Sequence, residues 1–353
     1  MKAVILAGGE ATRLHPLTCN IPKAMVPVLN TPFLEHVIRY LSRHQIEDII
    51  LTQGRLSHSI ESYFGDGSQF GVRLSYTLED NPLGTAGAVK NTGKYLGETF
   101  LVLNGDVFTN LDITAMIDFH RESKAKATIA LTPVDDPTSY GLVDTNAEGR
   151  VIRFLEKPNW NQVTSNMINA GIYVLEPDTL TQIPPQANFS FERELFPLLL
   201  DQGEPIYAYP SPAYWIDIGT PEKYLQLHRD LLSGKDSANQ CGLASDGEVL
   251  VGEQSYIHPK AQIKGPVVIG SGCTILEDAV IEQSIIWDKV KIGRGAKVRN
   301  SIVANNCCLN ADCVIEESVS GDNVTVGSGC RLEPGSKIWP GTMVEPETKP
   351  SLK

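Results

Sequence analysis

Apolar residues recur every six positions from residue 257 to residue 344, and this repeat constrains the fold more than any other feature. The step shortens to five once in every 17 residues, which makes Ile269, Ile286 and Val303 equivalent positions. Serines keep the same interval at positions 284, 301 and 318. A six-residue repeat grouped in threes predicts a three-sided coil, in which each side is a short strand with one inward apolar residue. The series runs Ile257, Ile263, Ile269, Ile275, Ile281, Ile286, Ile292, Val298, Val303, Leu309, Ile315, and later Val326, Leu332, Ile338 and Val344.

This repeat resembles the left-handed parallel β-helix of hexapeptide-repeat proteins. Stacked coils leave two open ends, so we expect self-association and predict a homo-oligomer formed through this domain. Some hexapeptide-repeat domains transfer acyl groups with a histidine as the base. The only histidine after residue 250 is His258, which precedes Pro259 ahead of the regular coils. Acyl transfer is therefore disfavoured.

Strand-like and helix-like patterns alternate through residues 1–235. This alternation predicts an α/β domain with a mostly parallel, Rossmann-like sheet, whose ligands bind at the carboxyl ends of the strands. The predicted strands are Ala3–Leu6, Asp48–Thr52, Phe100–Leu103 and Ala127–Leu131, and the predicted helices are Phe33–Ile46, Ile113–Ser123 and Thr220–Ser233. We predict three parts: an α/β domain over 1–235, a polar linker over 236–250 and the β-helix over 251–353.

A glycine-rich loop follows the first predicted strand and reads Leu6-Ala7-Gly8-Gly9-Glu10-Ala11-Thr12-Arg13-Leu14-His15-Pro16-Leu17-Thr18. A glycine pair brings backbone N–H groups close to an anion, and the cations Arg13 and Lys23 flank it. The loop lacks the lysine and serine or threonine of a P-loop and the spacing of a dinucleotide fold. It therefore predicts a separate kind of site for a nucleoside triphosphate.

Two aspartates each end an apolar run beside a glycine: Asp106 in Asn104-Gly105-Asp106, and Asp217 in Trp215-Ile216-Asp217-Ile218-Gly219. Mg²⁺ usually takes one or two carboxylates together with phosphate oxygens of a substrate. The pair therefore predicts a magnesium site.

Three other segments carry candidate binding residues. Glu156-Lys157-Pro158 places a lysine where it could hold a phosphate as a point charge. Asn169 and Gly171 precede a strand and could contact sugar hydroxyls. In the turn from Glu79 to Ala88, the backbone at Gly84 could approach a flat base, and Glu79 could accept hydrogen bonds from the edge of that base.

These motifs stand in the same order as those of the sugar-1-phosphate nucleotidyltransferases, which residues 1–235 resemble throughout. The correspondence includes the loop, Lys23-x-x-x-Pro27, Gly84-Thr85-Ala86-Gly87, Asn104-Gly105-Asp106, Tyr140-Gly141, Glu156-Lys157-Pro158, Asn169-x-Gly171 and Trp215-x-Asp217-x-Gly219. The Gly-Thr-Ala-Gly turn and the β-helix are most similar to the mannose-1-phosphate guanylyltransferases. The chain departs from the family at Ala11, where glycine is usual, and at His15. Alanine there must avoid positive φ or accept strain of roughly 1 kcal/mol.

The resemblance implies that a sugar-1-phosphate attacks a nucleoside triphosphate and releases pyrophosphate. Arg13 would neutralise the pyrophosphate, Lys23 the α-phosphate, and Asp106 and Asp217 would carry Mg²⁺. The implied nucleotide-binding residues are Leu6, Ala7, Gly8, Gly9, Thr12, Arg13, Glu79, Gly84 and Thr85. The implied sugar-phosphate residues are Gly141, Glu156, Lys157, Asn169 and Gly171.

Two alternatives stay open at this point. One keeps the chemistry and changes the substrates to glucose-1-phosphate with UTP or dTTP. The other is a non-catalytic regulatory subunit that senses a sugar nucleotide. A regulatory relative would be expected to lose the cations or carboxylates, all of which are present here.

The charge composition of the chain excludes some classes of binding partner. The chain has 42 acidic and 30 basic residues, a net charge of −12, which argues against nucleic acid and anionic membranes because both select clustered cations. No apolar run reaches the length of a membrane span. Seven cysteines, an odd number without a signal-peptide pattern, lead us to expect reduced thiols in the cytoplasm.

Overall fold

The computed structural model describes residues 1–9, 11–54, 58–234 and 248–346. The chain forms two compact units. The first contains Met1–Gly9 and Leu34–Ile216, and the second contains Glu10–Phe33 and Asp217–Lys353. The second unit thus combines an early segment of the chain with its last third. The sequence-based division at residues 235 and 250 stays a prediction about which parts fold independently.

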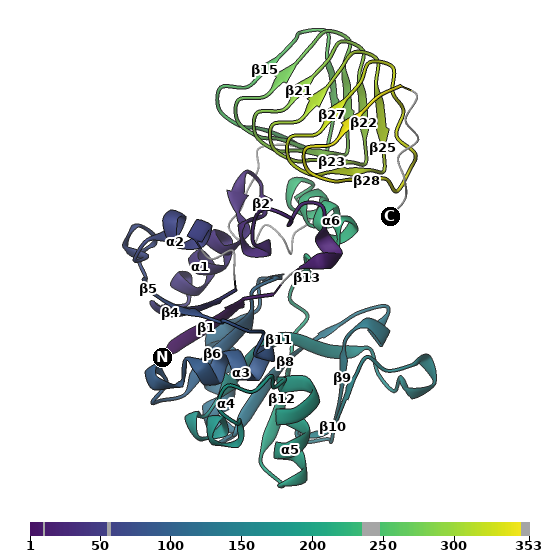
Figure 1. Cartoon of the computed structure of the whole chain (residues 1–353). Helices are drawn as coiled ribbons and strands as arrows, with labels where there is room; N and C mark the ends of the chain where they lie inside the picture. The colour runs from purple at the N-terminus through teal and green to yellow at the C-terminus, as the bar shows by residue number, and fades with distance from the viewer. Residues whose placement is uncertain (10, 55–57, 235–247, 347–353) are drawn as a thin grey trace. The chain divides into compact units, whose positions relative to one another are not determined.

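A nine-stranded mixed sheet forms the centre of the first unit (Figure 1). Its main order is β10-β9-β11-β6-β1-β4-β5, and β8 joins β11 to β12. The strands are β1 (Lys2–Ala7), β4 (Asp48–Gln53), β5 (Arg73–Leu78), β6 (Phe100–Asn104), β8 (Ala127–Pro133), β9 (Gly141–Thr145), β10 (Val151–Glu156), β11 (Met167–Leu175) and β12 (Ile206–Pro210). Strands β6, β1, β4 and β5 are parallel, whereas β11 runs antiparallel to β6, β8 and β9.

The parallel half of the sheet confirms the Rossmann-like prediction. Its strands β1, β4 and β6 are continuous apolar runs, as expected of strands covered on both faces. In the antiparallel half, the predicted strand Ala127–Leu131 lies within β8, whereas β9, β10 and β12 were not among the predicted strands. One reason is that β10 has an irregular register between Val151 and Arg153 and leaves Ile152 62 % exposed, so its burial does not follow a simple alternation.

Short helices accompany these strands: α1 (Phe33–Arg43), α2 (His58–Phe64), α3 (Gly84–Asn91), α4 (Ile113–Glu122) and α5 (Phe196–Asp201). Helix α4 begins after Asp112, whose carboxylate accepts from the backbone N–H of Ala115 and so caps the first turn. A buried aromatic cluster packs beside the sheet, with Tyr173, Phe191 and Phe196 at 5.1 to 5.7 Å between ring centroids. Two two-stranded sheets complete the topology: β7 (Val107–Thr109) with β13 (Trp215–Asp217), and β2 (Pro27–Val28) with β3 (Thr31–Pro32).

The second unit contains a three-sided parallel β-helix whose coils stack one on the next (Figure 1). Its three sheets are β14-β17-β20-β23-β26-β28, β15-β18-β21-β24-β27-β29 and β16-β19-β22-β25. The strands are β14 (Val249–Val251), β15 (Tyr256–Ile257), β16 (Gln262–Lys264), β17 (Val267–Ile269), β18 (Thr274–Ile275), β19 (Val280–Glu282), β20 (Ile285–Ile286), β21 (Lys291–Ile292), β22 (Lys297–Arg299), β23 (Ile302–Val303), β24 (Cys308–Leu309), β25 (Val314–Glu316), β26 (Val319–Ser320), β27 (Thr325–Val326), β28 (Lys337–Ile338) and β29 (Met343–Val344).

The register of the β-helix confirms the 17-residue spacing. Ile269 pairs with Ile286, and Ile286 with Val303, and all three are fully buried. The serine series forms a buried ladder, because the backbone N–H of Ser301 donates to Ser284 Oγ at 3.1 Å and that of Ser318 to Ser301 Oγ at 3.1 Å. Ser284 and Ser301 therefore each satisfy a backbone N–H of the next coil.

Helix α6 (Pro221–Leu232) and residues 10–33 pack within the same unit as the β-helix. Trp287 Nε1 donates to the hydroxyl of Tyr224 at 3.1 Å, and that hydroxyl donates to the carbonyl of Pro27. Asn30 Nδ2 donates to the carbonyl of Ile269 at 2.9 Å. The segment that contains Arg13 and Lys23 is thus anchored to the coils.

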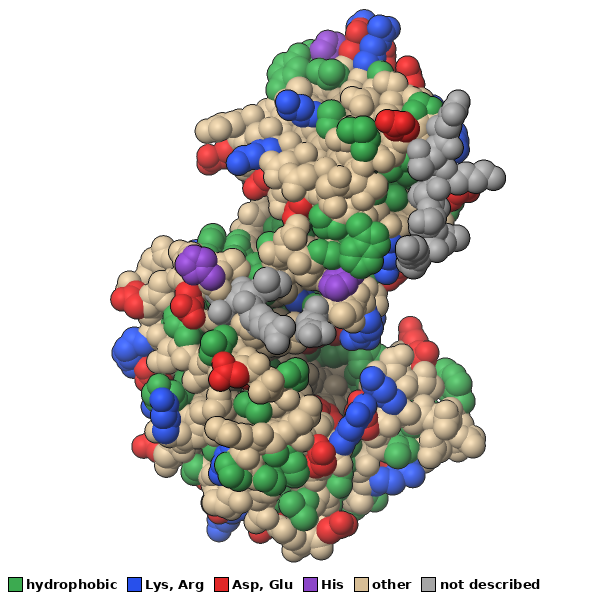
Figure 2. All heavy atoms as spheres, in the orientation of Figure 1, with side chains coloured by type: hydrophobic (Ala, Val, Ile, Leu, Met, Phe, Trp, Pro, Cys, Tyr) green, Lys and Arg blue, Asp and Glu red, His purple; other side chains and the backbone are tan. Residues whose placement is uncertain are grey.

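The described residues contain no helix that is both long and apolar enough to cross a membrane. On the face seen in Figure 2, acidic and basic side chains are interspersed over the described surface.

Candidate active site

The carboxyl end of β1 carries the start of the predicted phosphate loop. Leu6 pairs with Thr52 of β4 and with Asn104 of β6, so the loop leaves the sheet between two parallel strands. A Cβ at Gly8 would lie 2.7 Å from Glu79 Oε1. A larger residue at position 8 would have to displace the carboxylate of Glu79 from this position, so the structure brings these two predicted nucleotide residues together.

Glu79 is held in place within this corner. Its Oε2 accepts from the backbone N–H of Leu83 at 3.2 Å. Burial raises the pKa of the Glu79 carboxyl, and the hydrogen bond that it accepts from the backbone N–H of Leu83 lowers that pKa in part. A half-buried acceptor with a fixed orientation can read the edge of a base.

The turn that carries Asp106 packs on the end of β1. The backbone N–H of Gly105 donates to the carbonyl of Leu6 at 2.9 Å, and a Cβ at Gly105 would meet that oxygen at 2.4 Å. Only glycine allows this approach, which sets Asp106 directly beyond β6. The structure thus places Leu6 and Asp106 at one edge of the sheet.

The turn before α3 is packed against residues 187–189. Gly84 has a φ of +69°, and a Cβ there would lie 2.7 Å from the carbonyl oxygen of Phe189. The hydroxyl of Thr85, predicted to bind nucleotide, donates to Glu192 Oε2 at 2.9 Å and accepts from the backbone N–H of Phe191 at 2.9 Å. That hydroxyl fixes the turn in position.

Two predicted sugar residues face each other across β9 and β10. Gly141 pairs with Glu156, and a Cβ at Gly141 would lie 3.0 Å from Glu156 Oε2. Lys157 follows at a φ of +51°, and its backbone N–H donates to the carbonyl of Tyr140 at 2.9 Å. Burial raises the pKa of Glu156, the charge of Glu192 adds to this effect, and Lys157 and Arg193 oppose it.

The other predicted sugar residues occupy a bulge in β11. The register of β11 against β8 is irregular between Asn169 and Tyr173. Gly171 has a φ of +74° and a Cβ there would lie 2.5 Å from Asn104 Nδ2. The bulge therefore brings Gly171 against the residue two positions before Asp106.

Buried polar atoms without a protein partner lie at the carboxyl ends of β4 and β6. Asn104 Oδ1 and Gln53 Nε2 are both buried without a hydrogen-bond partner among the described residues, and Gln53 is 1 % exposed. Such atoms usually bind water or a ligand. Gln53 was not among the predicted site residues. Its position as a polar residue at the end of an apolar strand, on the carboxyl edge of the sheet, was the available signal.

The predicted charged site residues Arg13, Lys23 and Asp217 belong to the second unit. A Cβ at Gly219 would lie 2.8 Å from Asp217 Oδ2 and 3.0 Å from Arg13 Nη2, so both side chains lie against this glycine. Asp217 is 8 % exposed and forms an ion pair with Lys223 of α6. Lys223 was not among the predicted site residues. Its position three residues after the N-cap Thr220 was the available signal.

Ala11 adopts the left-handed conformation that glycine favours, with a φ of +48° and a ψ of +38°. Its carbonyl accepts from the hydroxyl of Thr18 at 3.0 Å and from the backbone N–H of Leu14 at 3.0 Å. These bonds fix the short 3-10 helix Thr12–Leu14 that carries Arg13, while Lys23 begins a second one, Lys23–Met25. Ala11 therefore accepts the strain of a positive φ rather than avoiding that conformation.

We expect Ala11→Gly to stabilise the protein by up to about 1 kcal/mol, because glycine adopts positive φ without the strain of a Cβ. The matched control is Ala115→Gly inside α4, where glycine costs about 0.5–1 kcal/mol. Urea unfolding of both variants measures the difference. A loss of stability in both variants would show that Ala11 is unstrained.

The described residues contain no group of three His, Cys, Asp or Glu side chains that could hold a metal ion alone. Mg²⁺ does not need such a group, because it takes only one or two carboxylates when phosphate oxygens of a substrate complete its coordination shell. Asp106 and Asp217 are hard oxygen donors of that kind.

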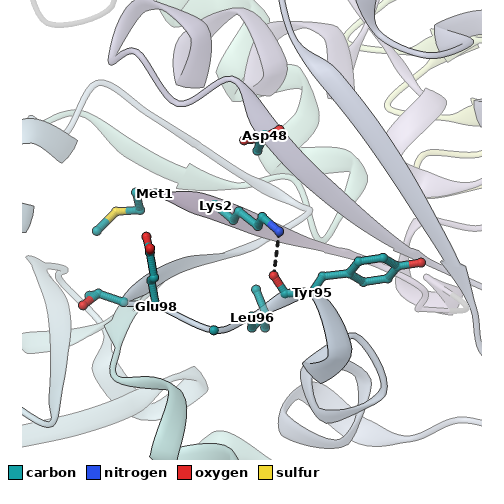
Figure 3. A pocket seen from close by; sticks show the side chains of 8 residues that line it. Met1, Lys2, Asp48, Tyr95, Leu96 and Glu98 are labelled. Carbon is teal, nitrogen blue, oxygen red and sulfur yellow. Dashed lines mark hydrogen bonds between the residues drawn. The ribbon is translucent and has the colours of Figure 1, made fainter.

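A pocket of about 290 Å³ lies at the other edge of the sheet, at the start of β1 (Figure 3). Met1, Lys2, Asp48, Tyr95 and Glu98 contribute to its lining, and Lys2 Nζ donates to the carbonyl of Tyr95 at 2.7 Å. In the first unit, none of the predicted substrate residues lines this pocket. The predicted residues Leu6 and Asp106 lie instead at the opposite edge, beyond the carboxyl ends of β1 and β6.

Together, the parallel sheet, the glycine-rich loop and the β-helix define a nucleotide-binding α/β protein with a hexapeptide-repeat domain. The Nucleotidyl transferase family matches residues 2–234, and the EIF2B subunit epsilon LbH domain, where LbH denotes a left-handed β-helix, matches residues 247–349. The chain belongs to the nucleotidyl transferase family.

Full-length relatives agree with this assignment. The chain is 42 % identical over 344 residues to the mannose-1-phosphate guanylyltransferase of Mycobacterium tuberculosis, covering 97 % of this chain and 95 % of that one. It is 35 % identical over 337 residues to a UTP--glucose-1-phosphate uridylyltransferase of Synechocystis, covering 86 % and 87 %. Among solved structures, HddC from Yersinia pseudotuberculosis complexed with GMP-PN is similar with a TM-score of 0.56 and 32 % identity, covering 64 % and 96 %.

Proposed function

We propose that this protein is a mannose-1-phosphate guanylyltransferase, which converts GTP and mannose-1-phosphate to GDP-mannose and pyrophosphate. A phosphate oxygen of the sugar-1-phosphate bonds to the α-phosphorus of GTP, and the bond from that phosphorus to the bridging oxygen of pyrophosphate breaks. The observation that carries the proposal is the 42 % identity to a mannose-1-phosphate guanylyltransferase along nearly the whole chain.

Both reactants are anionic, so catalysis consists mainly of charge neutralisation and in-line alignment. Arg13 would neutralise the departing pyrophosphate and Lys23 the α-phosphate. Lys157 would hold the sugar phosphate. Asp106 and Asp217 would hold Mg²⁺, which when bound would neutralise phosphate charge.

The corner formed by Gly8 and Glu79 supports guanine as the base. The pairing edge of guanine presents two adjacent N–H donors, and a carboxylate is an acceptor that can take two hydrogen bonds side by side. The closeness of Glu79 to Gly8 sets that acceptor beside the loop proposed to bind phosphate. Backbone at Gly84 would contact the plane of the base.

The remaining residues would bind the sugar. Glu156, Asn169 and Gly141 would contact its hydroxyls, and the bulge at Gly171 keeps Asn169 at the end of the sheet. We also propose that copies of the chain associate through the β-helix, because stacked coils leave open ends.

The test is pyrophosphate release with Mg²⁺ across GTP, UTP, dTTP, ATP and CTP, each with mannose-1-phosphate and with glucose-1-phosphate. We expect the highest kcat/KM for GTP with mannose-1-phosphate. A maximum for UTP or dTTP with glucose-1-phosphate would contradict the proposed substrates. Release with no pair, by a folded protein that binds a sugar nucleotide, would favour the regulatory alternative.

We expect the carboxyl of Glu156 to titrate above the ordinary glutamate pKa of 4.5, because burial is the largest influence on it. The folded protein then keeps this proton to higher pH than the unfolded chain. Glu156 therefore reduces stability as the pH rises from 4.5 through its folded pKa. Both of its oxygens act only as acceptors, for example toward sugar hydroxyls, above that pKa. Carboxyl ¹³C NMR, assigned with Glu156→Gln, measures the midpoint. A midpoint at or below 4.5 would contradict this account.

A further inference from the structure

We infer that Glu192 is a positioning residue. Its one carboxylate holds two segments in place relative to each other: the turn at Gly84 and Thr85, proposed to contact the base, and the bulge at Asn169 and Gly171, proposed to bind the sugar. The inference rests on the proposed function of these two segments. Glu192 lies in the turn of π-helix Phe191–Leu195, and single π-turns occur frequently at functional sites. It belongs to none of the motifs in the sequence that predict substrate contact.

One oxygen of Glu192 fixes the nucleotide side. Its Oε2 accepts from the hydroxyl of Thr85 at 2.9 Å and from that of Ser190 at 2.6 Å. Thr85 is the second residue of α3, directly after Gly84. The position of the turn that would contact the base therefore depends on this oxygen.

The other oxygen fixes the sugar side through two further bonds. Glu192 Oε1 accepts from the hydroxyl of Tyr173 at 2.9 Å, and that hydroxyl accepts from Asn169 Nδ2 at 2.7 Å. A tyrosine hydroxyl has one proton, so donation to Glu192 leaves it an acceptor for Asn169. Asn169 Oδ1 in turn accepts from the backbone N–H of Gly171 at 2.9 Å.

The network is rigid because its central member is buried. Tyr173 is fully buried and packs against Phe191 and Phe196, so its hydroxyl has little freedom to find another partner. A carboxylate accepts from both Thr85 and Tyr173, whereas an apolar replacement leaves their hydroxyls unsatisfied. The turn at Thr85 and the bulge at Asn169 would then both lose their fixed orientation.

Substrate affinity separates this role from a purely structural one. Calorimetry and steady-state kinetics with GTP and mannose-1-phosphate compare the full-length protein with Glu192→Ala, Glu192→Gln and Tyr173→Phe. We expect Glu192→Ala to weaken the binding of both substrates by ~10-fold or more, on the scale of misplacing a binding group. Tyr173→Phe breaks only the sugar branch, so it should weaken mannose-1-phosphate alone.

Two further variants sharpen the test. Glu194→Ala removes an exposed carboxylate of the same turn, which accepts from the backbone N–H of Ser190, and should leave both affinities unchanged. Glu192→Gln should bind both substrates more tightly than Glu192→Ala, and should also lower the NMR titration midpoint of Glu156, whose pKa the charge of Glu192 raises.

Unchanged affinities in Glu192→Ala together with a lower melting temperature would overturn the inference. If Glu192→Ala does not fold, Tyr173→Phe decides: equal effects on the two substrates, or none, would count against the inference. Affinities require no turnover, so a wild-type protein that binds both substrates without releasing pyrophosphate refutes the proposed function and leaves Glu192 to be judged separately.

Discussion

Replacing either Lys23 or Asp106 by alanine is expected to lower turnover by at least ~100-fold while leaving the protein folded. Each residue would supply one preorganised charge to a reaction between two anions, and removal of one such interaction costs about 10²–10³ in kcat. Lys23 begins a short 3-10 helix and Asp106 ends a turn beyond β6, so neither supports a hydrophobic core. Pyrophosphate release with GTP and mannose-1-phosphate measures the loss.

The matched control is Asp118→Ala. Asp118 lies on α4, where its carboxylate is 59 % exposed and pairs with the exposed Arg121. This variant should keep wild-type turnover, because exposed pairs contribute little. Near-normal turnover in Lys23→Ala or Asp106→Ala would refute the proposed roles.

Replacing Trp287 by alanine is expected to destabilise the second unit by about 3–5 kcal/mol, the usual cost of truncating a buried tryptophan. Trp287 is 2 % exposed and donates to Tyr224, which is fully buried. Because Arg13 and Lys23 belong to this unit, activity should fall at temperatures where it unfolds. Urea unfolding, followed by circular dichroism and by activity, measures both effects.

Two variants separate packing from hydrogen bonding at this position. Trp287→Phe keeps most of the packing and loses the bond to Tyr224, so the expected loss from that bond is about 1 kcal/mol. Trp160→Ala truncates a side chain that is 64 % exposed and should change stability by less than about 0.5 kcal/mol. Equal effects of Trp287→Ala and Trp160→Ala would show that Trp287 does not hold the unit together.

The β-helix could be predicted almost completely from the sequence. Each coil buries one apolar residue per side, so the 17-residue interval between Ile269, Ile286 and Val303 directly records the stacking of coils. The parallel strands β1, β4 and β6 were also predictable, because they are covered on both faces and therefore read as unbroken apolar runs.

Contacts between residues that are far apart in the sequence leave no periodic pattern in that sequence. Glu192 meets Thr85 across 107 positions, and Lys223 meets Asp217 only because the chain turns before α6. The bulge at Asn169 and Gly171 depends on the neighbouring Asn104, which local propensity does not encode. Local sequence patterns therefore predict candidate substrate residues, but they do not predict the distant contacts that hold those residues in place.

The grouping of residues 10–33 with the β-helix was also not predicted. It arises from individual side chains, such as the ring of His15 at 5.6 Å from that of Trp339, and Asn20 Nδ2 at 3.2 Å from Asp322 Oδ2. Neither pair belongs to a repeat. The hexapeptide repeat determines which residues face the inside of the coils. It does not determine the outward-facing residues, which make the contacts with residues 11–33.

The central claim is transfer of a guanylyl group to a sugar phosphate. Phosphorus NMR of the wild-type protein with GTP, mannose-1-phosphate and Mg²⁺ follows each phosphate directly. We expect GDP-mannose and pyrophosphate to appear in equal amounts, with no free phosphate. Release of GDP and phosphate, or an unchanged spectrum from a protein that binds both substrates, would contradict it.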